Sequence, residues 1–119
     1  MNVGEKILST NQKEIGCRDI LPNELMLYLS YNRPIFYSWG AHNFKYFTDS
    51  KIFRMTVNGF KHKGYVFITL NFLDLFDVYY TQKNGTIVAI DKDIYNDQLM
   101  NIIDERIEKI PLYDKSSLN

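Results

Sequence analysis

Three polar residues, Asn71, Asp74 and Asp77, interrupt the most apolar stretch of the chain, YVFITLNFLDLFDVYY at 65–80. Two carboxylates side by side can perform general acid–base catalysis or hold a metal ion. Side chains alternate along a strand, however, so positions 74 and 77 point to opposite faces unless the chain bends between them. We therefore predict that the two carboxylates do not converge, that Asp74 lies in a turn, and that Asp77 is a solvent-facing strand residue.

The histidines and the cysteine are the other side chains with chemical potential. His42 and His62 fall in expected loops, where they could form a metal site with Asp49. No recognised ligand spacing links these residues, and Cys17 has no second thiol with which to bind zinc. A nucleophilic Cys17 would need a nearby base, which the sequence does not place. We therefore expect surface histidines, a small apolar cysteine and no metal.

Glycine motifs that cradle phosphate groups are absent, and so is the G-x-S-x-G nucleophile elbow. The carboxylates, histidines and cysteine are thus the only catalytic candidates, and each has a simpler structural interpretation. We expect a protein that is not an enzyme and that uses no cofactor.

The region 41–65 mixes cations with aromatic rings, and Asp49 is its only acid. Proteins that bind single-stranded nucleic acid combine phosphate contacts from cations with bases stacked on rings. The region has no RNP signature, and most of its rings are expected in the core. The nucleic-acid interpretation predicts that the cations Lys45, Arg54, Lys61 and Lys63 lie on one exposed surface. The candidate surface for nucleic acid or a partner comprises Lys45, Tyr46, Lys51, Arg54, Phe60, Lys61, His62 and Lys63.

Hydrophobic spacing and turn signals predict the helices and strands that must position these residues. Pro22 suits the first turn of a helix at 21–30, and Pro111 ends a helix that begins at Asp91 or Asp93. Asn84-Gly85 is the strongest hairpin signal. The expected strands lie at 35–39, 44–47, 51–57, 65–71, 75–81 and 86–91, the first two being separable by a turn or bulge at GAHN.

The order of these elements predicts an α+β fold. We expect an antiparallel meander of four to five strands, with an N-terminal helix and a C-terminal amphipathic helix packed on the sheet. A chain of 119 residues is about one domain long. The expected organisation is a polar segment at 1–19, a single domain at 20–113 and a tail at 114–119, with a short helix around Ser9 to Gly16.

Composition bears on the partners and on the cellular location expected for the protein. Lys and Arg balance Asp and Glu, 14 against 14, so no net charge attracts nucleic acid or a membrane. A single cysteine allows no internal disulfide and fits a reducing compartment. No secretory signal or membrane span is expected, which predicts a cytoplasmic location.

Three motifs carry a resemblance to a known family: YSWGAHNF, VFITLNFLDLFDV and IYNDQLMNIID. In order and spacing, they resemble a family of small uncharacterised proteins of bacteriophages and other mobile elements. The resemblance covers Ile20 to Tyr113. It implies a bacteriophage or mobile-element setting, and it assigns no catalytic residue.

Two function classes follow from the sequence. The first is a non-enzymatic protein-binding module that contacts itself or a host factor through its sheet or a hairpin tip, with aromatic residues as anchors. The second is a small nucleic-acid-binding protein that uses region 41–65. Affinity should depend weakly on salt in the first case and steeply in the second.

Overall fold

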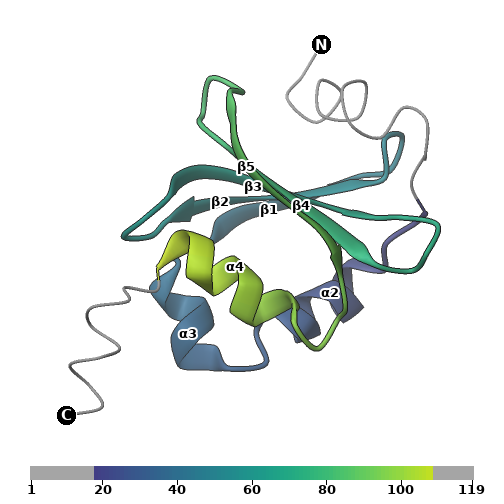
Figure 1. The fold of residues 1–119 in the computed structure, drawn as a ribbon, viewed down its shortest axis with the longest axis horizontal. Helices are drawn as coiled ribbons and strands as arrows, with labels where there is room; N and C mark the ends of the chain where they lie inside the picture. The colour runs from purple at the N-terminus through teal and green to yellow at the C-terminus, as the bar shows by residue number, and fades with distance from the viewer. Residues whose placement is uncertain (1–17, 109–119) are drawn as a thin grey trace.

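The computed structural model describes residues 18–108, in which five strands form one antiparallel sheet and three helices pack on one side of it (Figure 1). The predicted α+β fold class is confirmed. The elements, in chain order, are α2 (Pro22–Leu29), α3 (Arg33–Ser38), β1 (His42–Phe47), β2 (Ile52–Asn58), β3 (Lys63–Leu70), β4 (Phe76–Thr81), β5 (Ile87–Ile94) and α4 (Leu99–Ile107).

The sheet is a meander in which spatial order follows chain order, β1-β2-β3-β4-β5. Each strand pairs with the next through a short turn, as the predicted breaks at Asn71–Asp74 and at Asn84-Gly85 require. Gly85 has a positive φ of 95°, a conformation that glycine adopts without steric cost. Strands β1 and β5 are the two edges.

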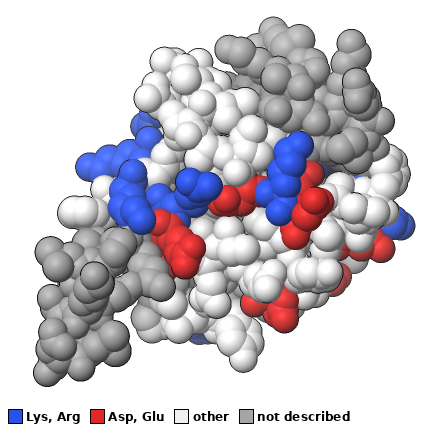
Figure 2. All heavy atoms as spheres, viewed as in Figure 1, with Lys and Arg blue, Asp and Glu red and all other residues white. Residues whose placement is uncertain are grey.

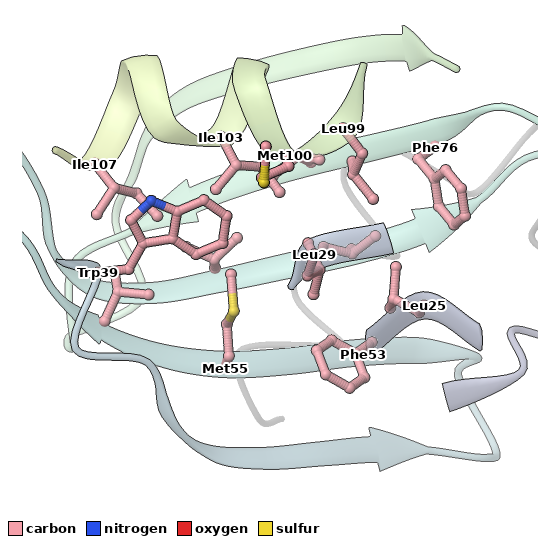
Figure 3. Packing of buried hydrophobic residues seen from close by; sticks show 14 of the residues in the cluster. Leu25, Leu29, Trp39, Phe53, Met55, Phe76, Leu99, Met100, Ile103 and Ile107 are labelled. Carbon is pink, nitrogen blue, oxygen red and sulfur yellow. The ribbon is translucent and has the colours of Figure 1, made fainter. Parts of the chain in front are cut away.

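The core lies between the sheet and the helices (Figure 3). Alternation along the strands sends Phe53, Met55 and Phe76 toward the helices, where they meet Leu29 and Ile103. We call this helix-covered side the first face. Near-complete burial of such side chains stabilises the fold by roughly 1.5–3 kcal/mol each.

One predicted strand, 35–39, is a helix in the structure. Asn32 begins α3 with its side-chain oxygen accepting a hydrogen bond from the Ile35 N–H at 3.4 Å, and Pro34 occupies the first turn. The helix buries Phe36, and Trp39 follows it directly. The β-forming residues are outweighed by this N-cap and by the apolar surface that a short helix can bury.

The predicted start of the C-terminal helix was also wrong. Asp91 and Asp93 belong to β5, which continues to Ile94, and α4 begins only at Leu99. Ile94 pairs with Phe76 and is buried, so the residues at which the helix was expected to begin form part of a strand instead. The predicted helix at 21–30 is confirmed as α2.

The second face of the sheet carries its own apolar cluster, Ile52, Phe67 and Tyr79, which is buried and includes no residue of α2, α3 or α4. Residues 1–17 and 109–119 lie outside the described residues, and with them most of the polar segment predicted at 1–19, the predicted short helix around Ser9 to Gly16 and the tail predicted at 114–119. None of the helices within residues 18–108 is long and apolar enough to cross a membrane.

Candidate functional site

The turn between β3 and β4 is built around Asn71, which is buried. Its side-chain oxygen accepts hydrogen bonds from the N–H groups of Leu73 at 2.9 Å and Leu75 at 3.2 Å. Its own N–H donates to the Leu75 carbonyl at 2.9 Å, and its carbonyl accepts from the Asp74 N–H at 3.0 Å. One asparagine therefore fixes most of the backbone of this turn.

Two carboxylates accept hydrogen bonds from the Asn71 side chain. Its side-chain amide donates to Asp77 Oδ1 at 3.3 Å and to Asp93 Oδ1 at 3.0 Å, and the Asp93 N–H donates to Asp77 Oδ1 at 2.9 Å. Asp77 is only 2% exposed, so its predicted solvent-facing position was wrong. It faces inward because the buried amide and N–H donors satisfy its charge.

Asp74 does lie in the turn, as predicted, with a positive φ of 62°. Its exposed carboxylate accepts a hydrogen bond from Arg18 Nη1 at 2.7 Å. Asp74 and Asp77 thus make separate contacts, Asp74 with Arg18 and Asp77 with Asn71. The polar residues of the stretch 65–80 hold the turn between β3 and β4 in place.

The tip of this turn is apolar. Phe72 is 59% exposed and Leu73 is 72% exposed, and we call these two residues the apolar tip. Core packing does not account for these two apolar side chains, because both are exposed. Polar residues at the same positions could form the same turn. Exposed apolar side chains on a rigid turn are typical of a docking point, because little entropy is lost when they bind. The only signal for this pair in the sequence is that two bulky apolar residues stand between the turn-forming Asn71 and Asp74.

The candidate surface predicted from region 41–65 is divided by the sheet. Cross-strand pairing places Lys45 opposite Arg54, and Lys63 opposite Asn58, all on the second face. Tyr46 is on the first face, where its hydroxyl accepts a hydrogen bond from the Ile20 N–H at 3.0 Å. Lys51 lies in the β1–β2 turn, with a φ of 60°.

The remaining members, Phe60, Lys61 and His62, lie in the β2–β3 turn, and Lys61 caps the C-terminus of α4. The Lys61 N–H donates to the Ile107 carbonyl at 2.7 Å, and Lys61 Nζ donates to the Glu105 carbonyl at 2.6 Å. These bonds satisfy carbonyls that a helix end leaves without partners. Lys61 thus has a structural role and does not share the surface of Lys45 and Arg54.

A shallow hollow of about 230 Å³ lies beside this turn. Arg106 crosses it from α4 and binds Asp91 on β5 through two hydrogen bonds, of 3.0 and 2.8 Å. Burial acts to raise the pKa of Asp91, but the Arg106 guanidinium and the Tyr80 hydroxyl outweigh it and lower the pKa below its ordinary value. The hollow is lined by Lys61, His62, Tyr80, Val88, Ala89, Glu105 and Arg106.

Tyr80 lines the hollow, and the pKa of its hydroxyl lies above the ordinary value. Burial is the main reason that its pKa is raised, and the Asp91 charge adds to the effect. The ion pair beside Tyr80 is Asp91–Arg106, at 2.8 Å. Figure 2 shows positive and negative side chains next to one another on the face in view, and the lining of the hollow likewise includes both signs, Lys61 and Arg106 with Glu105.

The histidines are not gathered into a metal site. His42 Nδ1 lies 2.7 Å from the Gly40 carbonyl, and His62 Nε2 lies 3.2 Å from the Tyr65 carbonyl. Within residues 18–108, no group of three or more His, Cys, Asp or Glu side chains could hold a metal ion. Cys17 lies outside the described residues.

Comparisons with known proteins give no match: no family model, no curated protein and no solved structure matches this chain.

Proposed function

We propose that this protein is a non-enzymatic protein-binding module that contacts its partner, a second copy or a host protein, through the apolar tip. The observation that carries the proposal is the exposure of Phe72 and Leu73 on a turn fixed from beneath by Asn71. Aromatic and aliphatic anchors of this kind dominate the binding energy of protein interfaces when they enter a pocket of the partner.

The fixed backbone of the turn supports a binding role. Asn71, Asp77 and Asp93 form a polar network under the turn, which keeps the backbone in one conformation before any partner arrives. A flexible tip would lose roughly 0.5–1.5 kcal/mol for each side chain that binding immobilises, and a fixed backbone avoids part of the total cost.

The edges of the sheet favour contact through side chains over extension of the sheet. Asn43 on β1 and Asp93 on β5 both have a positive φ, and both edge pairings contain a register shift. Bulges and charged residues on edge strands oppose pairing with another strand. The tip is therefore a better candidate for the contact than either edge.

The test compares two matched changes. In Phe72→Ser/Leu73→Ser the apolar tip is removed, whereas Phe60→Ser changes a 69% exposed phenylalanine on a different turn. Sedimentation velocity of the purified chain detects self-association, and co-purification of the tagged chain from its natural cell detects another protein.

We expect a complex in one of these two measurements that is lost in the double variant and kept in Phe60→Ser. Identical complexes in all three proteins, or no complex with the unchanged chain, would refute the proposal. The bacteriophage or mobile-element setting and the cytoplasmic location remain predictions.

A further inference from the structure

The first three strands carry positive charge without negative charge. No aspartate or glutamate occurs in β1, β2 or β3. Strand pairing brings Lys45, Arg54 and Lys63 to the second face, together with the rings of Phe47 and Tyr65. We call these five residues the basic aromatic strip.

Two of the cations lie directly opposite each other. Lys45 pairs with Arg54 in the register of β1 and β2, and like charges in this position destabilise a sheet. Neither forms a salt bridge within residues 18–108. Both approach the Phe47 ring, with Lys45 Nζ at 5.0 Å and the Arg54 guanidinium carbon at 5.4 Å from its centre. Cation–π attraction offsets part of the repulsion, and no acidic side chain of residues 18–108 forms a salt bridge with either cation.

Arg54 adds a second unfavourable feature. Its Nε is buried and has no hydrogen-bond partner within the described residues. Its guanidinium also approaches the Tyr65 ring, at 5.6 Å, so two rings hold the group in position. A fixed guanidinium, and beside it a lysine that forms no salt bridge within residues 18–108, are ready to receive an anion without rearrangement.

We propose that the basic aromatic strip binds single-stranded nucleic acid. The exposed Lys45 and Lys63 contact phosphates, Arg54 contacts a phosphate between them, and the partly exposed rings of Phe47 and Tyr65 offer surfaces for unpaired bases. Charge complementarity favours this occupant over an apolar protein surface. The inference does not depend on the proposed function, since the strip and the apolar tip share no residue.

The test is anisotropy of a short labelled oligothymidylate over a salt series from about 20 to about 200 mM. Three phosphate contacts predict a slope of log affinity against log salt of roughly −2, since each contact on a single strand contributes about −0.7. In Lys45→Gln/Lys63→Gln, the slope should fall in magnitude by roughly 1.4. Lys83→Gln/Lys92→Gln, which removes two exposed lysines outside the strip, should leave it unchanged.

Stacking is tested separately from charge. Tyr65→Leu should weaken binding several-fold at every salt concentration without a change in slope, because it removes a ring and no charge. Arg54→Lys keeps the charge and loses the planar group, so it should also weaken binding, and circular dichroism verifies that it folds.

Three results would overturn the inference. The first is no binding at the lowest salt concentration. The second is an equal loss in the two double variants. The third is equally tight binding of inorganic polyphosphate or polyglutamate, which would show that the strip attracts any polyanion and reads no bases.

Discussion

At the scale of single residues, Asn71 decides the structure of the β3–β4 turn. Its side chain makes four hydrogen bonds, two accepted from backbone N–H groups and two donated to carboxylates. Buried polar groups stabilise a fold only when they are satisfied, and each of these partners would lose its bond if Asn71 were removed.

Asn71→Ala should therefore lower the free energy of unfolding by about 2 kcal/mol, because it leaves the buried Asp77 carboxylate short of a donor. Urea unfolding followed by tyrosine and tryptophan fluorescence measures this change. The control is Asn84→Ala, which removes one exposed turn bond, from the Thr86 N–H, and should cost less than about 1 kcal/mol. Equal costs for the two variants would contradict the role given to Asn71.

The sequence predicted part of this arrangement. Asn71 and Asp74 were recognised as turn residues, because their side chains commonly bond nearby backbone. The burial of Asp77 was missed, since it depends on Asp93, which is 16 residues away along the chain and adjacent only in the paired strands. Local spacing carries no information about such a contact.

At the scale of elements, α4 packs on the core and also contacts the sheet and its turns, including Gly59 against its C-terminus and Arg106 against β5. A Cβ on Gly59 would lie 2.2 Å from Ile107 Cγ2 and 2.6 Å from the Ile107 carbonyl oxygen. The backbone of the β2–β3 turn therefore touches the helix itself, which only glycine permits.

Gly59→Ala should lower the free energy of unfolding by about 2 kcal/mol, because the turn and α4 must move apart. Thermal unfolding followed by circular dichroism measures the change. The neighbouring Asn58→Ala alters an exposed side chain and should cost far less. A Gly59→Ala protein as stable as Asn58→Ala would show that the contact is loose.

The Asp91–Arg106 pair gives a pH-dependent contribution. Since the folded pKa of Asp91 lies below the ordinary value of 3.8, the pair stabilises the fold above that value and loses its effect as the pH falls through the folded pKa. Arg106→Gln should cost about 0.5 kcal/mol at neutral pH, a small value because the arginine side chain is 45% exposed. Urea unfolding at several pH values should show the two proteins converging in acid. A constant difference down to acidic pH would contradict this explanation.

At the scale of the whole molecule, the meander separates residues that are close together in the sequence and were expected to form one surface. Region 41–65 reads as one basic aromatic surface, yet alternation and the β2–β3 turn distribute it between two faces and the end of α4. The fold class could be predicted because strand spacing and turn signals are local. The division of the surface could not, because it depends on register and on which face the helices cover.

The same architecture keeps the proposed protein contact and the proposed nucleic-acid contact apart. The apolar tip lies where β3 meets β4, whereas the basic aromatic strip crosses β1, β2 and β3 on the second face. Changes at the tip should therefore leave oligonucleotide affinity unchanged, and changes in the strip should leave the protein complex unchanged.

The most direct test of the central claim is photo-crosslinking with a benzophenone amino acid placed at position 72 or at position 60 in cells that naturally hold the protein. Both positions are exposed phenylalanines, and only Phe72 belongs to the apolar tip. We predict a discrete adduct from position 72 that is absent from position 60 and disappears when Leu73→Ser is added. Equal adducts from the two positions, or none from position 72, would contradict the account.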